Sequence, residues 1–108
     1  MAKLSGNWIN RVMRLAIYMR DRFTCVYCCR DLHTAPAFTI TLDHIKPRNA
    51  GGKHTPKNLV TACRSCNSSK KHHRDWINKR QQKRVDRQIA KPLPMLAAER
   101  IIFGDEDE

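Results

Sequence analysis

The chain has 108 residues, of which 21 are lysine or arginine and 10 are aspartate or glutamate, so its formal net charge is +11. This length predicts a single domain, and no apolar run approaches the roughly 18 residues of a membrane span. The N-terminus, MAKLSGNWINRVMR, lacks the apolar stretch of a secretory signal, so we expect an intracellular, cytoplasmic protein. The charge indicates a polyanionic partner and favours nucleic acid over a membrane, with a merely solvated charged surface as the alternative.

Apolar residues at helical spacing predict a first α-helix over residues 7–20, with Asn7 as its N-cap. The stripe consists of Trp8, Val12, Leu15 and Met19, with Ile9, Met13 and Ala16 beside it. We expect this helix to pack against the core.

A turn and a strand are predicted next. Residues 23–30, FTCVYCCR, are typical of a tight turn between short extended pieces. Phe38, Ile40 and Leu42 alternate with threonines, which predicts a half-buried strand.

The segment after this strand contains strong turn signals. Pro47 and the Gly51–Gly52 pair predict a turn and an irregular loop. A helical turn is expected from Asn58 into the second cysteine pair, and a helix from Asn67.

Residues 70–91 carry nine lysines or arginines and only two acidic residues. At about 3.6 residues per turn, five basic side chains fall within an arc of roughly 100°. These are Arg80, Lys83, Arg84, Arg87 and Lys91. The arc is either a solvated face or a stripe that faces phosphates, and the same choice stays open for Lys70.

Two prolines and an acidic tail mark the end of the chain. Pro92 and Pro94 are expected to end the basic helix, and residues 95–103 to form a short terminal helix. The tail at 105–108 is entirely acidic, which leaves 21 basic against 6 acidic residues through Gly104. We therefore expect one domain over residues 1–104.

Five cysteines are present, at positions 25, 28, 29, 63 and 66. An odd number without a secretory signal argues against a disulfide framework. Cys25–Cys28 and Cys63–Cys66 each have the spacing of a zinc knuckle, so we predict one closed, structural four-cysteine Zn²⁺ site. Buried hydrophobic cysteines or a redox motif are the alternatives. Cys29 is expected to stand outside the site.

Five motifs occur in a fixed order over about residues 22–71: CVYC, LDHIKP, GG, NLV and CRSCNSSK. Together they resemble the HNH nuclease family. The resemblance implies an α+β fold, a small zinc-stapled ββα-metal finger, flanked here by α-helices at both ends. It also implies metal-dependent hydrolysis of phosphodiester bonds in double-stranded DNA, by nicking or cutting, that leaves 5′-phosphate and 3′-hydroxyl ends.

The resemblance also assigns roles to four residues. His44 would be the general base, and an imidazole with a pKa near 6.5 suits that task at neutral pH. Asp43 and Asn67 would hold one divalent cation, and Asn58 would fix the loop that carries His44. Asn67 stands where histidine is common in the family, and an oxygen-only pair favours Mg²⁺ or Mn²⁺. In a flat strand Asp43 and His44 point to opposite faces, so both can serve one site only where the strand ends and twists.

Other functions remain open from the sequence. One is a non-catalytic zinc-ribbon module that binds nucleic acid, because fold does not establish activity. Another is an accessory subunit of a larger DNA-processing assembly, such as phage DNA packaging, and a homodimer is equally allowed. The remaining histidines match no motif position, and we expect surface roles for them, with DNA contact as the alternative for the last two. They are His33, His54, His72 and His73.

Overall fold

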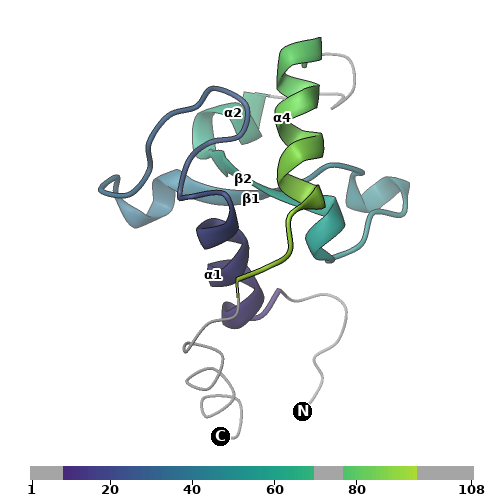
Figure 1. Ribbon diagram of the computed structural model, residues 1–108, viewed down its shortest axis with the longest axis horizontal. Helices are drawn as coiled ribbons and strands as arrows, with labels where there is room; N and C mark the ends of the chain where they lie inside the picture. Colours follow the sequence, from purple (N-terminus) through teal and green to yellow (C-terminus); the bar gives the residue numbers. More distant parts are fainter. Residues whose placement is uncertain (1–8, 70–76, 95–108) are drawn as a thin grey trace, which may run out of the picture.

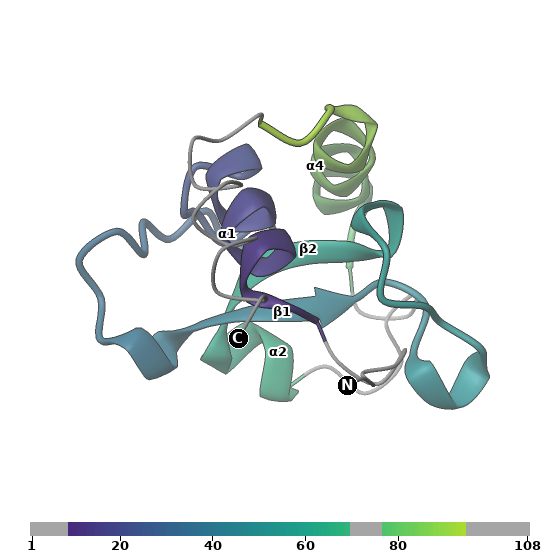
Figure 2. The ribbon, with the colours of Figure 1, turned by 90° about the horizontal axis from the view of Figure 1, so that it is seen from below.

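A two-stranded antiparallel ribbon lies at the centre of the computed structural model, which describes residues 9–69 and 77–94 (Figure 1). Strand β1 (Ile40–His44) pairs with β2 (Leu59–Cys63). Helices α1 (Arg11–Arg20) and α4 (Lys79–Ala90) lie on one side of the ribbon and α2 (Arg64–Ser69) on the other (Figure 2). The predicted α+β class is confirmed.

Three 3₁₀ turns interrupt the loops between these elements: η2 (Ala37–Thr39), η3 (Arg48–Ala50) and η4 (Pro56–Asn58). Within the described residues, none of the helices is both long and apolar enough to cross a membrane.

Helix α1 begins later and faces the core differently than predicted. Its N-cap is Asn10, whose side chain accepts a hydrogen bond from the Met13 N–H at 2.8 Å. The predicted start at residue 7 is therefore wrong, and Asn7 and Trp8 lie outside the described residues. Met19, expected in the apolar stripe, is 40% exposed, while Arg20 is 4% exposed. The buried arginine rotates the helix so that Ile17 faces the ribbon.

The strands also differ from the sequence-based expectation. Phe38 lies in η2 and is 67% exposed, so the strand begins only at Ile40. The helical turn expected from Asn58 is instead β2, whose five residues are all buried. Pairing with β1 decides this, because it satisfies the backbone groups that burial removes from water. The following helix begins at Arg64, three residues before the expected Asn67.

Helix α4 matches the predicted basic helix. Asn78 and Gln81 form a capping box at its start, and its C-cap is Lys91, directly before Pro92. The prediction that Pro92 and Pro94 end the helix is confirmed. The expected terminal helix at 95–103 lies outside the described residues, as do Lys70, His72 and His73.

Two apolar clusters fill the space around the ribbon. Ile17 and Tyr18 of α1 pack with Leu42 and Leu59 on one side. The other cluster joins the 25–32 segment to β2 and to Val85 of α4. Each cluster is small, so the fold depends on polar and metal-binding links between elements as well.

A buried ion pair fastens α1 to β2. Arg20 donates to both carboxylate oxygens of Asp21 at 2.7 and 3.0 Å. The same guanidinium donates to the carbonyls of Pro56 and Leu59 at 3.0 and 2.7 Å. Asp21 in turn accepts the Thr61 N–H at 2.9 Å. Because the two carbonyls flank Asn58 on either side, this network also positions that residue.

We expect Arg20→Ala to destabilise the zinc-loaded protein by about 3–5 kcal/mol, because it leaves Asp21 as a buried, uncompensated charge. Denaturant unfolding measures the change. The control is Arg80→Ala on the exposed side of α4, which should alter the free energy of unfolding by no more than about 0.5 kcal/mol. Equal stabilities of the two variants would contradict the assignment.

Candidate functional site

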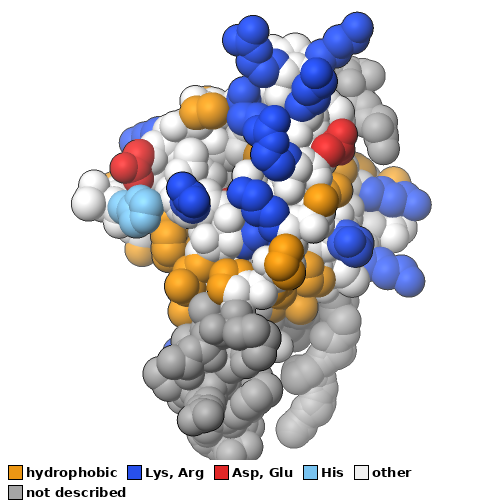
Figure 3. Space-filling model, in the orientation of Figure 1, with side chains coloured by type: hydrophobic (Ala, Val, Ile, Leu, Met, Phe, Trp, Pro, Cys, Tyr) orange, Lys and Arg blue, Asp and Glu red, His pale blue; other side chains and the backbone are white. Residues whose placement is uncertain are grey.

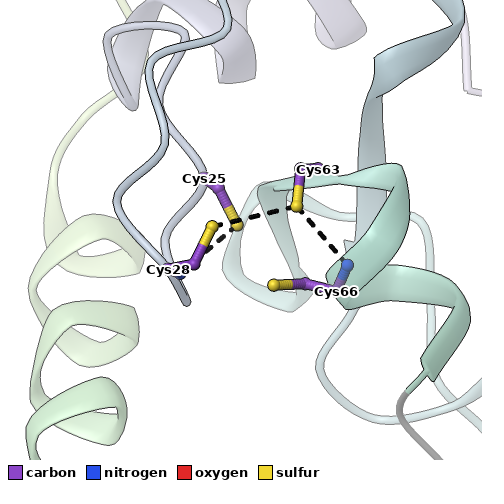
Figure 4. Close-up of side chains that lie close together, drawn as sticks. All are labelled: Cys25, Cys28, Cys63 and Cys66. Carbon is purple, nitrogen blue, oxygen red and sulfur yellow. Dashed lines mark hydrogen bonds between the residues drawn. The ribbon is translucent and has the colours of Figure 1, made fainter.

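The two cysteine pairs converge on one point (Figure 4). The sulfur atoms of Cys25, Cys28, Cys63 and Cys66 all lie within 4.8 Å of one another. The Cys28 and Cys63 sulfurs are 3.8 Å apart. A tetrahedral Zn²⁺ with Zn–S bonds of about 2.3 Å requires a sulfur separation of about this size. The donor set and spacing therefore fit zinc, and the prediction that these four cysteines are positioned to bind a metal is confirmed.

Backbone hydrogen bonds and burial act in opposite directions on the ionisation of the clustered thiols. The Cys28 and Cys66 N–H groups point at the sulfurs of Cys25 and Cys63, at 3.5 and 3.4 Å. Burial raises the pKa of the Cys25 and Cys66 thiols. At Cys63 burial also opposes ionisation, but hydrogen bonds from Cys66, Cys28 and Cys25 outweigh it and lower the pKa of this thiol. The hydrogen bonds thus favour the thiolate at Cys63, whereas burial disfavours it at Cys25 and Cys66.

Asp43 lies beneath the surface against the first cysteine pair. It is 3% exposed, and the Tyr27 hydroxyl donates a hydrogen bond to its Oδ2 atom. Burial, followed by the negative charge of Asp43, raises the pKa of Tyr27, so the phenol stays protonated and remains a donor. A hydroxyl that donates to a carboxylate stabilises its charged form. The hydrogen bond from Tyr27 therefore favours the carboxylate form of Asp43, which is the form that ligates a cation.

Asn67 lies on α2 with its side chain turned toward β1. Its Nδ2 atom donates to the Thr41 hydroxyl at 3.0 Å and to the Leu42 carbonyl at 3.3 Å. The Leu42 carbonyl belongs to the peptide that joins Leu42 to Asp43. Because the nitrogen of the amide is engaged, its oxygen is the atom that can ligate a cation. Asn67 thus contacts the backbone directly before Asp43. A carboxylate and an amide oxygen are ligands of the kind that Mg²⁺ or Mn²⁺ prefers.

His44 is the last residue of β1, opposite Leu59. Strand alternation places its side chain on the face opposite to that of Asp43. Asn58 holds the chain directly after it: its Oδ1 accepts the Lys46 N–H at 2.7 Å, and its Nδ2 donates to the Lys46 and Lys53 carbonyls at 3.1 and 2.9 Å. Asn58 therefore closes both ends of the 46–53 loop, next to the imidazole.

The same loop folds back on itself through its glycines. Gly51 has φ of 93°, and a Cβ on Gly52 would lie 1.7 Å from the Lys46 carbonyl oxygen, so only glycine fits there. The turn brings His54 back to His44, with His54 Nδ1 at 2.9 Å from His44 Nε2. His54 was expected to have only a surface role, and the structure places it against the candidate base instead.

Basic side chains follow α4 across one face of the molecule (Figure 3). Those at positions 80, 83, 87 and 91 are exposed. Arg84 differs from them, because its Nε and Nη2 atoms donate to the carbonyls of Val26 and Tyr27 at 2.9 and 2.6 Å. Arg84 thus docks α4 on the first cysteine pair, a role that its place in the charged arc did not indicate.

Three residues near the site have no signature in the sequence pattern: Tyr27, Arg48 and His54. Tyr27 occupies a spacer position between two cysteines, where any residue satisfies the metal-ligand pattern. Arg48 and His54 lie in an irregular loop, where no periodicity relates side chains to a face. The one available signal was the Gly51–Gly52 pair, which predicts that the loop reverses direction.

Comparison with known families agrees with this geometry. Residues 25–83, more than half of the chain, match the model of a family described as HNH endonuclease. The matched segment contains all four clustered cysteines together with Asp43, His44, Asn58 and Asn67. Comparison with curated proteins gives no match.

We expect the metal-free protein to lose its cooperative unfolding transition. Structural zinc contributes about 10–16 kcal/mol in small peptides, which is comparable to the roughly 5–15 kcal/mol net stability of a whole domain. Thermal melting by circular dichroism, with and without a strong chelator, tests this. A cooperative melt that persists after all zinc has been removed would rule it out.

Two cysteine variants sharpen the experiment. Cys66→Ser should reduce the zinc content and abolish the cooperative melt, whereas Cys29→Ser, at an exposed position outside the cluster, should bind one zinc ion per chain and melt as the parent does.

Proposed function

The chain belongs to the HNH endonuclease family, and we propose that it hydrolyses phosphodiester bonds in double-stranded DNA with His44 as general base. The observation that carries the proposal is the contact of Asn67, on α2, with the Leu42 carbonyl, directly before Asp43 in the strand that ends in His44. A general base must lie within reach of the reacting group, and His44 is the last residue of the strand that carries Asp43.

The proposed reaction begins when His44 accepts a proton from water. The resulting hydroxide forms a bond to phosphorus, the bond to the 3′ oxygen breaks, and that oxygen takes a proton from solvent. A divalent cation, when bound by Asp43 and Asn67, supplies positive charge for the phosphate and the departing oxygen. Asn58 contributes by holding the backbone after His44. Tyr27 contributes by donating a hydrogen bond to the Asp43 carboxylate.

The basic face of α4 gives the proposal a DNA-binding surface. Its exposed lysine and arginine side chains can neutralise backbone phosphates, which supplies affinity with little sequence readout. We also propose a cytoplasmic location, because four thiolates persist as metal ligands in a reducing compartment.

A non-catalytic nucleic-acid-binding module or an accessory subunit of a DNA-processing assembly would share this fold and charge. The burial of Asp43 and the orientation of the Asn67 amide against the preceding peptide favour the enzyme, because a purely structural zinc finger does not require either side chain.

We expect His44→Ala to lower the rate of plasmid nicking by about 10²–10⁴-fold, the range for loss of a general base. Activity is expected in Mg²⁺ and Mn²⁺ and is expected to vanish in EDTA. The matched control is His33→Ala, an exposed histidine paired with Asp31, which should cleave as the parent does. Equal cleavage by His44→Ala and the parent would defeat the catalytic assignment, and activity with zinc alone would refute the metal preference.

We expect DNA affinity to fall steeply as salt rises, because binding releases counterions from the phosphates. Replacing Arg80, Lys83 and Arg87 together by alanine should reduce the slope of log affinity against log salt by about 0.9 for each phosphate that the variant no longer neutralises. Fluorescence anisotropy on duplex DNA over a salt series measures the slope. An unchanged slope in a variant that retains its zinc would exclude α4 from the interface.

A further inference from the structure

Next to His44 lies a second histidine that the proposed reaction does not use. The ring centroids of His44 and His54 are 4.9 Å apart, and His44 Nε2 lies 2.9 Å from His54 Nδ1. On the other side of the His54 ring, Arg48 Nη1 lies 2.5 Å from His54 Nε2. The three side chains form a continuous chain of contacts from the exposed Arg48 to the half-buried His44.

Arg48 sets the direction of these hydrogen bonds. A guanidinium can only donate, so His54 Nε2 accepts and carries no proton. A neutral imidazole has one proton, which in His54 must then be on Nδ1, where it is donated to His44 Nε2. A neutral His44 consequently carries its own proton on Nδ1.

Hydrogen bonds in this direction, from Arg48 to His54 and from His54 to His44, prevent proton abstraction by Nε2 of His44. A base has to present an unprotonated nitrogen to water, and in His44 that nitrogen is Nε2, which faces His54. If Arg48 leaves His54, the chain can reverse: His54 takes its proton on Nε2, and its Nδ1 then accepts Nε2–H of His44. Both rings stay neutral and exchange their protons with water, and Nδ1 of His44 becomes the accepting nitrogen.

A DNA phosphate can compete with His54 for the hydrogen bond that Arg48 donates. Arg48 is exposed and begins η3, directly after Pro47 and four residues from the base. A phosphate accepts a charge-assisted hydrogen bond from a guanidinium, which is stronger than one to a neutral imidazole.

His54 itself stays in place. The Gly52 turn and the bond from Asn58 Nδ2 to the Lys53 carbonyl fix the backbone beside it.

We propose that His54 is a positioning residue for His44, and that transfer of Arg48 from His54 to a DNA phosphate sets the tautomer in which His44 accepts the proton of the attacking water. The inference rests on the proposed function, which assigns the base to His44. It adds a coupling between DNA binding and the ability of His44 to accept a proton from water.

Kinetics on a duplex substrate in Mg²⁺ test the proposal through the split between kcat and KM. His54→Ala should lower kcat on the order of tenfold to a hundredfold, the range for residues that orient a functional histidine, and leave KM unchanged. His54→Asn should recover part of this loss, because its amide oxygen can accept from His44 Nε2. Arg48→Ala should raise KM and retain kcat within about threefold, while His33→Ala should leave both constants unchanged.

Parent-like kcat in His54→Ala, or no recovery in His54→Asn when both variants bind zinc as the parent does, would overturn the proposal. Nitrogen-15 NMR of the zinc-loaded protein without DNA gives a second readout that is independent of cleavage. We expect the Nδ1–H tautomer at both His44 and His54, with a shift toward Nε2–H in Arg48→Ala. Nε2–H at both rings in the parent would refute the coupling, even if His44→Ala had already shown that His44 is the base. Conversely, full activity of His44→Ala would defeat the proposed function. The tautomers measured by NMR would then still test whether Arg48, His54 and His44 form the directed hydrogen bonds described above.

Discussion

The convergence of four sulfurs is the constraint on which the rest of the structure depends. It joins the 25–28 turn to the junction of β2 and α2, two segments that are 35 residues apart between Cys28 and Cys63. Tyr27 is carried between the first two ligands and reaches Asp43, while Asn67 directly follows the last ligand and reaches β1. A bound metal in this chain therefore places both oxygen donors of the candidate site, although it lies outside the chemistry itself.

Among the described residues, two buried carboxylates are stabilised in different ways. Asp21 is paired with Arg20 and accepts a backbone N–H, so its charge is used to fasten α1 to β2. Asp43 accepts a hydrogen bond from the Tyr27 hydroxyl, which stabilises the charged form of the carboxylate. The contrast explains how one fold uses the same chemical group both as a structural fastening and as a candidate metal ligand.

In the proposed mechanism, the 45–58 loop connects DNA binding to the base. It is irregular in outline but tightly held, since Asn58 bonds to Lys46 and Lys53 within it and Gly52 packs where any side chain would collide with the Lys46 carbonyl. Its rigidity keeps His54 against His44, while Arg48 remains at the surface, where a phosphate can compete for it. Helix α4 contributes from the other side, because Arg84 and Gln81 bind the Tyr27 carbonyl and so brace the turn that holds Asp43.

The sequence by itself determined the metal cluster, the order of the motifs, the end of α4 and the candidate residues, because ligand spacing, proline and residue chemistry are local properties. Only the tertiary structure decided the rest. Residues 59–63 became a strand because β1 was available to pair with them, and α1 turned its face because Arg20 had to reach Asp21 and two carbonyls. Tyr27, Arg48 and His54 entered the site through contacts between distant segments and through the direction of hydrogen bonds. Contacts between distant segments and hydrogen-bond directions produce no periodic pattern in a sequence, because both depend on the three-dimensional path of the chain.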